Sequence, residues 1–220
     1  MTGVTTPAGR TASRGRIDKR EAILAAAFTV FARRGYSQAC VQEIAEEAGV
    51  AKLTVYNHLS DKENLFRHAI EAAANTVMAD NLAVVEQLRD PGDDLRAALE
   101  SVAYRMLQVC CGEHSRALRW LTYAQVARFP DLIDTVQGRT SDRISEALAD
   151  RLARLSLAGR LRPCDPAQAA GQLLALLTGP MEALSRLGTR KVPAAETRAV
   201  AKAAVDTFLR AYGPASGEPT

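Results

Sequence analysis

The most reactive side chains of this sequence are thiols and imidazoles, and three of them lie close together near its middle. Cys110, Cys111 and His114 stand within a few residues of one another. Such groups can bind zinc, and adjacent thiols can be oxidised, so one interpretation is a metal or redox site. The other is that two cysteines at the end of an apolar helix face simply pack, because no second Cys/His pair lies nearby.

Groups that would serve an enzyme are not arranged for catalysis. The sequence has no nucleophile beside a base, no carboxylate pair and no glycine-rich phosphate loop. Its three histidines, His58, His68 and His114, lack the spacing of metal ligands. We therefore expect no catalytic residue, no metal and no cofactor. The alternative to a protein without catalytic activity is an all-α enzyme that carries a DNA-binding motif. Turnover of a bound ligand would support it.

Charge and composition indicate where a polyanion would bind. The net charge of the 220 residues is +3, and residues 1–67 account for all of it. Arg10, Arg14 and Arg16 lie in a predicted flexible arm, residues 1–16, where they could follow a DNA backbone or do nothing. No apolar run is long enough to span a membrane. The four cysteines have no framework spacing, which favours a reduced, cytoplasmic protein.

The elements that carry these residues should all be helices. Ala, Leu and Arg are abundant, they favour helices, and no segment alternates apolar and polar residues as a strand does. We predict an all-α fold of about nine helices in two domains, residues 1–67 and 68–213, before a disordered tail at 214–220. The predicted helices span residues 18–34, 41–48, 52–58, 60–88, 93–111, 115–128, 130–158, 165–187 and 193–212. Asp93 and Asp165 are predicted N-caps, and Ser60 with Glu63 forms a predicted capping box.

The second and third predicted helices form a helix-turn-helix motif. Gly49 permits the left-handed backbone that their sharp turn needs. On a helical wheel, Val55 and Leu59 face inward onto the other helices. Leu53 and Asn57 then face outward, as residues of a helix in a DNA major groove do. Two short helices around a glycine also occur in all-α proteins that do not bind DNA.

Leu53 and Asn57 suggest how such a helix would read DNA. An asparagine can bind adenine through N6 and N7 together, and a leucine can cover a thymine methyl group. We therefore expect A·T base pairs beneath this helix. The alternative is that Leu53 only fills an apolar surface and that Asn57 contacts phosphate.

The residues around this motif resemble the N-terminal domain of the TetR family. Residues 18–67 contain, in the family's order and spacing, Ile44-Ala45, Ala48-Gly49-Val50, Tyr56-Asn-His58 and Lys62-Glu63-Asn-Leu65. The stretch from Ala124 to Leu132 is similar to the AefR-like class of TetR C-terminal domains. The resemblance implies a homodimeric transcriptional regulator that responds to a ligand. Residues 1–67 would be its DNA-binding domain, and residues 68–213 its effector-binding and dimerisation domain.

The resemblance also implies roles for individual residues at the DNA. Tyr56, His58 and Lys62 match residues that contact phosphates, and Lys52 and Thr54 match residues near base edges or the backbone. The alternatives are a packing role for Tyr56 and a plain surface charge for Lys62.

Three positions depart from the family pattern. Ala51 stands where the family has a capping residue, so the recognition helix should lack its usual cap. Cys40 replaces a hydroxyl residue before the second helix, which puts one phosphate contact in doubt. Leu53 replaces a frequent glycine.

For the second domain the resemblance implies an effector pocket among helices of residues 68–160. Its candidate lining is Met78, Val102, Met106, Trp120 and Tyr123, although core packing is the default for aromatic residues at this spacing. The implied mechanism is repression, released when a small apolar effector lowers affinity for a palindromic operator. Activation, or binding that requires the ligand, is the alternative.

Dimerisation is predicted to use the last two long helices, because their apolar stripes are wider than one core requires. The two stripes comprise Leu173, Leu174, Leu177, Met181 and Leu184, and Val205, Phe208, Leu209 and Tyr212.

Overall fold

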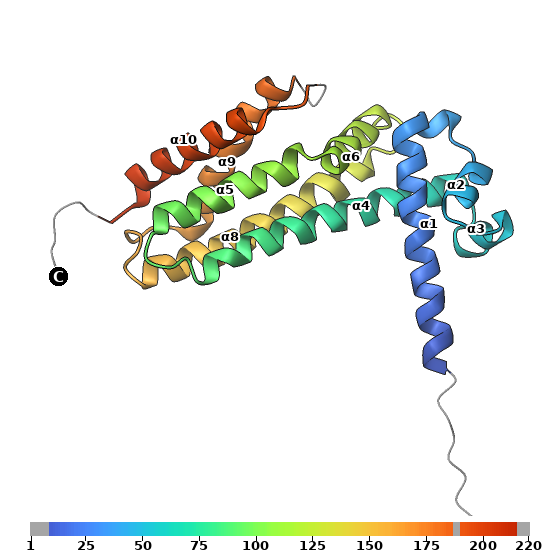
Figure 1. Ribbon diagram of the computed structural model, residues 1–220, viewed down its shortest axis with the longest axis horizontal. Coiled ribbons are helices and arrows are strands. Elements are labelled where there is room, and N and C mark those ends of the chain that lie inside the picture. Colours follow the sequence, from blue (N-terminus) through green and yellow to red (C-terminus); the bar gives the residue numbers. More distant parts are fainter. Residues whose placement is uncertain (1–8, 187–189, 215–220) are drawn as a thin grey trace, which may run out of the picture. The chain divides into compact units, whose positions relative to one another are not determined.

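The structure is a computed structural model, and it describes residues 9–186 and 190–214. Within these ranges the chain is helical and contains no strand, which confirms the predicted all-α fold (Figure 1). No helix in these ranges is long and apolar enough to cross a membrane. The chain divides into two compact units. The first comprises Met1–Ala73 and Leu121–Leu132, and the second comprises Ala74–Trp120 and Ile133–Thr220.

The first unit is built mainly from the N-terminal helices. They are α1 (Gly9–Gln38), α2 (Val41–Glu47), α3 (Lys52–His58) and the beginning of α4 (Lys62–Val85). The end of α6 (Glu113–Ala124) and most of α7 (Asp131–Ile133) complete the unit, although they come much later in the sequence. A segment predicted to belong to the second domain therefore packs with the N-terminal helices.

Helix α1 is longer than predicted, because it begins at Gly9 and not at Asp18. The predicted flexible arm is thus wrong for residues 9–16, while residues 1–8 lie outside the described part of the chain. No proline follows Pro7 in this stretch, although Gly9 and Gly15 are weak helix formers. At its other end α1 is interrupted at Gly35, whose φ of 75° is left-handed.

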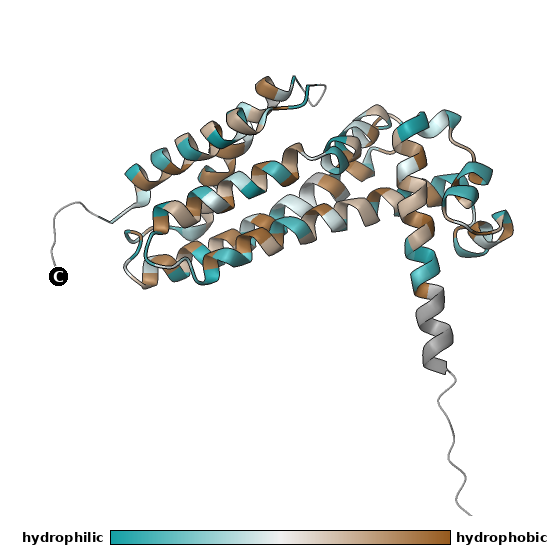
Figure 2. Cartoon of the chain, viewed as in Figure 1, coloured by the Kyte–Doolittle hydropathy of each residue, from teal (hydrophilic) through white to brown (hydrophobic). Residues whose placement is uncertain are grey.

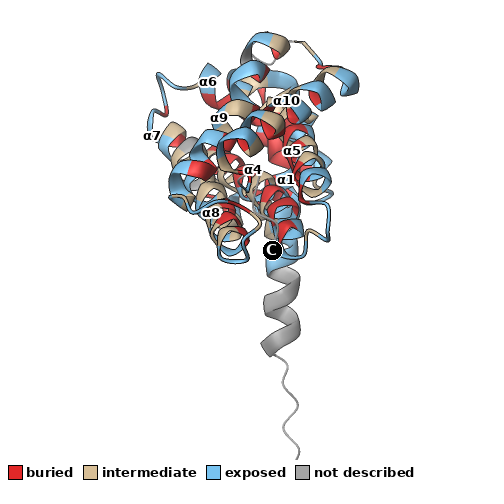
Figure 3. Ribbon diagram, turned by 90° about the vertical axis from the view of Figure 1, so that its left-hand side faces the viewer, coloured by how far each residue is buried: buried red, intermediate tan, exposed pale blue. Residues whose placement is uncertain are grey.

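The second unit is a bundle of amphipathic helices. It contains the rest of α4, a 3-10 turn (Glu86–Arg89), α5 (Leu95–Cys111), the start of α6, a π-helical stretch (Asp134–Arg139), α8 (Thr140–Leu157), α9 (Pro166–Ser185) and α10 (Ala194–Tyr212). Apolar and polar residues alternate along these helices at helical spacing (Figure 2). Helix α5 packs beside α10, and α9 packs beside both α8 and α10. Their buried sides form one aliphatic core (Figure 3).

Local signals placed most helix ends of this unit correctly. Asp165 caps α9 as predicted, since its Oδ1 accepts hydrogen bonds from the backbone N–H groups of Ala167 and Gln168. Asp94 caps α5, at 2.9 Å from the N–H of Ala97, so the predicted cap at Asp93 is wrong by one residue. The long helix predicted from Pro130 also forms, but it contains the π-helical stretch.

Candidate nucleic-acid interface

The turn between α2 and α3 has the geometry that its sequence predicts. Gly49 has a φ of 65°, the left-handed conformation that a side chain disfavours. The N–H of Val50 then donates to the carbonyl of Ala45 at 2.9 Å. Before α2, the Sγ of Cys40 accepts a hydrogen bond from the N–H of Glu43 at 3.4 Å, so this thiol acts as the helix cap that a hydroxyl would otherwise provide.

Helix α3 is oriented as the helical wheel predicts. Val55 is 0% exposed and Leu59 is also buried, so both anchor the helix on its unit. Leu53 is 70% exposed, and Asn57, about one turn later, is exposed on the same outward face. Ala51 makes no side-chain cap, which confirms that the recognition helix lacks one. The outward face of α3 is therefore free to approach a groove without unpacking the unit.

The four residues of α3 matched to DNA contacts all reach solvent. Tyr56 is 41% exposed, and the Nζ of Lys52 lies 5.9 Å from the centre of its ring. Lys52 is exposed, while Thr54 and His58 are partly exposed on the flanks. The ammonium of Lys52 and the hydroxyl of Tyr56 are both donors that an anion could accept from. Their predicted contacts with DNA remain predictions.

Lys62 is held in place by the first unit itself. Its Nζ donates to the carbonyl oxygen of Ser37 at 3.1 Å and lies 4.9 Å from the ring centre of Tyr36. Burial lowers the pKa of Lys62, with a smaller contribution from the nearby positive charge of Arg128. An ammonium group has three donors, so one that faces neither the Ser37 carbonyl nor the Tyr36 ring could donate to a phosphate. Lys62 is thus more than a loose surface charge.

The start of α4 differs from the predicted capping box. Asp61, not Ser60, accepts the capping hydrogen bond, from the N–H of Asn64 to its Oδ1 at 2.8 Å. Asn64 also donates from Nδ2 to the Oγ of Ser60 at 2.9 Å, a contact between two side chains. The backbone hydrogen bond from Asn64 lowers the pKa of Asp61. Glu63 is left available for pairs with basic side chains.

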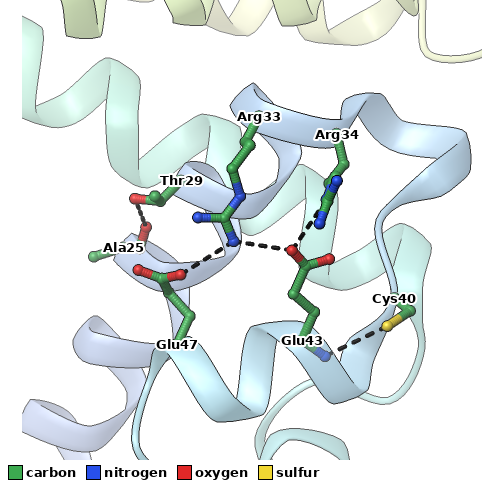
Figure 4. A network of polar contacts seen from close by, with 7 residues as sticks. All are labelled: Ala25, Thr29, Arg33, Arg34, Cys40, Glu43 and Glu47. Atoms are coloured by element: carbon green, nitrogen blue, oxygen red, sulfur yellow. Dashed lines mark hydrogen bonds and ion pairs between the residues drawn. The ribbon is translucent and has the colours of Figure 1, made fainter.

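Two arginines at the end of α1 hold α2 (Figure 4). Arg33 donates from Nη2 to Glu43 at 2.9 Å and to Glu47 at 3.2 Å, and Arg34 donates from Nε to Glu43 at 3.1 Å. The hydrogen bond from Arg33 is the main reason that the pKa of Glu43 lies below its usual value. This network fixes the helix that supports α3.

An aromatic cluster joins the late segment 121–132 to the early helices of the first unit. Phe31, Tyr36, Phe66 and Phe129 contact one another with ring centres 4.9–6.0 Å apart. Phe129 is fully buried, so packing is its role, as the default interpretation of this aromatic residue predicted.

Charged residues surround this cluster. Arg67 pairs with Asp131, and Arg128 lies 3.7 Å from the Oε2 of Glu63. The guanidinium of Arg128 also lies over the ring of Tyr36, 5.0 Å from its centre. Sequence reasoning missed these contacts, because partners about sixty residues apart leave no local pattern.

The predicted effector-pocket residues are spread over different environments. Val102 and Met106 are buried in the core of the second unit, and Met78 is partly buried. Trp120 and Tyr123 are 54% and 50% exposed. The pocket stays a prediction, and Val102 and Met106 are the two members that face the interior of their unit.

The predicted dimer stripes are mostly core. The dimer contact of Leu173, Leu177, Met181, Val205 and Phe208 stays a prediction, and these side chains are buried within the protomer. Each stripe packs against the neighbouring helices of the same unit, which explains its width. Leu174, Leu184, Leu209 and Tyr212 are partly buried against that core and only partly available.

Comparisons with known proteins agree with the motif. The model of the AefR-like transcriptional repressor C-terminal domain matches residues 97–214, more than half of the chain. The model of bacterial regulatory proteins of the tetR family matches residues 23–69. These matches confirm both resemblances predicted from sequence.

Individual relatives are similar over different shares of their length. The transcriptional activator FasR of Mycolicibacterium smegmatis is 34% identical over 39% of each chain, so this chain spans about two fifths of that protein. The repressor AcnR of Corynebacterium diphtheriae is 31% identical over 66% of this chain and 68% of its own. A solved TetR-family regulator from Mesorhizobium loti MAFF303099 is 31% identical, with a TM-score of 0.82 over 90% of this chain and 98% of its own.

Proposed function

Because the chain belongs to the TetR family of bacterial transcriptional regulators, we propose that it binds operator DNA with α3 in the major groove. The observation that carries this proposal is the outward face of α3. Leu53 and Asn57 are exposed there, while Val55 and Leu59 anchor the opposite face. The exposed side of the motif therefore consists of side chains that can contact the base edges of DNA.

Phosphate contacts would set the register of α3 on the duplex. Lys52 and Tyr56 form one exposed pair, and Lys62 offers a further donor at the N-terminus of α4. The positive end of the α4 dipole and the ammonium charge would act on the same anion. Such contacts bring affinity and position without base preference.

Two copies of the chain would present two recognition helices to a palindromic operator, about 34–36 Å apart. For the dimer contact we propose the outward faces of α9 and α10, in place of the buried stripes. Small exposed residues repeat every four positions on both helices: Gly171, Ala175, Gly179 and Ala183 on α9, and Ala195, Ala199, Ala203, Thr207 and Ala211 on α10.

The glycines of α9 support this choice of face. A Cβ added to Gly171 or Gly179 would meet nothing within 4 Å, so packing inside the protomer does not require glycine at either position. Glycine inside a helix lowers stability by about 1 kcal/mol relative to alanine. A close approach by a helix of a second copy would account for it.

Charge placed on this face tests the dimer. Ala175→Glu and Ala203→Glu should give folded monomers in light scattering at micromolar concentration. Gln108→Glu, on an exposed position of α5, is the matched control and should leave the dimer intact. A monomeric wild type, or dimers in both alanine variants, would contradict the proposed interface.

For the effector we propose a small apolar molecule bound within the second unit, near Val102 and Met106. Their aliphatic surroundings support this, because such a site offers burial and few polar partners. Binding that favours a different separation of the two recognition helices would lower operator affinity. Binding to chromosomal DNA also implies a cytoplasmic location.

Gel shifts with DNA fragments from the neighbourhood of the protein's own gene test operator binding. We expect at least one fragment to bind specifically in the presence of competitor DNA. A reporter fused to that promoter should rise when the gene is deleted, as repression requires. A fall would favour activation, the role in the name of the relative FasR, and no specific fragment would contradict the proposal.

A further inference from the structure

Two thiols, a guanidinium and a thioether meet at the end of α5 in the second unit. Cys110 and Cys111 are the last two residues of α5, and both are partly exposed. Arg119 of α6 donates from Nη1 to the Sγ of Cys110 at 3.6 Å and to its carbonyl oxygen at 2.9 Å. The Sγ of Cys111 lies 3.5 Å from the Sδ of Met181 on α9. Residues from three helices therefore converge on adjacent thiols.

The guanidinium of Arg119 favours the thiolate form of Cys110. A hydrogen bond from the Cys111 thiol and the positive charge of Arg119 lower the pKa of Cys110, although burial opposes them. The same contact with Cys110 raises the pKa of Cys111. The negative end of the α5 dipole disfavours an anion here, so Arg119 is the group that compensates it.

The same arrangement disfavours a metal site. A guanidinium beside the Cys110 sulfur repels a second cation. In the described part of the chain, no group of three His, Cys, Asp or Glu side chains lies close enough to hold a metal ion. Thiolates beside basic side chains are instead the cysteines that react with oxidants.

We propose that Cys110 and Cys111 form a redox site that reacts with hydroperoxides. The Cys110 thiolate attacks the terminal oxygen of the peroxide, and the O–O bond breaks. Sulfur is oxidised by two electrons to a sulfenic acid, while the peroxide is reduced and leaves as an alcohol, or as water, after taking a proton. The Cys111 thiol then loses its proton and attacks the Cys110 sulfur, which expels water and forms a disulfide.

The position of the pair at a helix end makes the second step possible. A disulfide between adjacent residues closes a small ring that a helical backbone does not accommodate. Cys111 is the last residue of α5, and the next residue, Gly112, already has an extended ψ of 157°. The strain can therefore be relieved by unwinding one turn, with loss of the Cys111–Met181 contact.

Thiol mapping of the reduced full-length protein tests the site. After brief treatment with hydrogen peroxide or cumene hydroperoxide, the tryptic peptide from Met106 to Arg116 should lose two hydrogen atoms, which marks the internal disulfide. In Cys111→Ser, a dimedone adduct should accumulate on Cys110 instead. Cys40 and Cys164, the other two free thiols, should be modified later than Cys110 in the same sample.

A matched pair of arginine variants isolates the role of Arg119. Arg119→Gln should slow oxidation of Cys110 at pH 7 by about fivefold or more, because the thiolate fraction of Cys110 then falls towards that of an ordinary cysteine. Arg105→Gln removes an exposed charge from α5 and should not change the rate. Equal rates in both variants, earlier oxidation of Cys40 or Cys164, or a sulfenic acid that persists in the wild type would overturn the proposal.

Discussion

Lys62 at the start of α4 donates a hydrogen bond from Nζ to the carbonyl oxygen of Ser37, 3.1 Å away near the end of α1. The carbonyl accepts a hydrogen bond from one of the three N–H groups of Lys62, and the ring of Tyr36 lies on another side of the ammonium group. The ammonium group therefore has a fixed position before DNA arrives. A prepositioned phosphate contact loses less side-chain entropy on binding than a free lysine would.

Lys62→Ala should weaken binding to operator and to unrelated DNA alike, and it should lower the salt slope by about one unit. Losing the Ser37 contact should also reduce the free energy of unfolding by about 1 kcal/mol. Gel-shift titrations at several salt concentrations, with a urea melt, measure both effects. Lys191→Ala, an exposed lysine of the second unit, is the control. An unchanged slope would remove Lys62 from the phosphate contacts.

The Arg33–Glu43 pair predicts a pH dependence of stability. The folded pKa of Glu43 is lowered, mainly by the hydrogen bond from Arg33. Its contribution to stability is therefore present above the unfolded pKa and is lost as pH falls through the folded pKa. Arg33→Gln should lower the Tm at pH 7, and the difference from wild type should shrink as the pH falls into that acidic range. Because both groups are solvent-exposed, the effect should be small. A difference that grows in acid would contradict this assignment.

Phe129 predicts a stability effect in the DNA-binding unit from a residue outside the motif. Its ring is buried and contacts the rings of Tyr36 and Phe66. Phe129→Ala should cost about 3–5 kcal/mol of unfolding free energy, and Phe129→Leu clearly less, because leucine fills more of the space. Hydrogen exchange should show the loss in α1 and in the start of α4. Protection that is unchanged there would mean that segment 121–132 does not stabilise these helices.

How far the sequence predicts this molecule depends on the range of each signal. Gly49, Val55 and Leu59 act within one or two helical turns, so the motif and the outward face of α3 follow from spacing alone. Capping signals are equally local, yet neighbouring aspartates compete, and Asp94 rather than Asp93 caps α5.

The errors arise where partners are distant in sequence. The apolar stripe of α9 looks the same whether it meets its own core or a second copy, and only the fold shows that Leu177 is core. Likewise, the pairing of Arg67 with Asp131 joins residues far apart in the chain and has no periodic signature. A search for apolar stripes does not detect the small exposed residues of α9 and α10, on which the proposed dimer face rests.

Selection of binding sites from random DNA tests the central claim most directly, with wild type, Asn57→Ala and Leu53→Gly compared in parallel. We expect the wild type to enrich a palindrome with A·T pairs beneath α3. Asn57→Ala should lose about 1–3 kcal/mol of binding free energy and relax the base preference at one position in each half-site. Leu53→Gly should change the base preference at a neighbouring position of the half-site. If the wild type enriches no sequence, or both variants return its motif unchanged at every position, α3 does not read DNA bases through these residues.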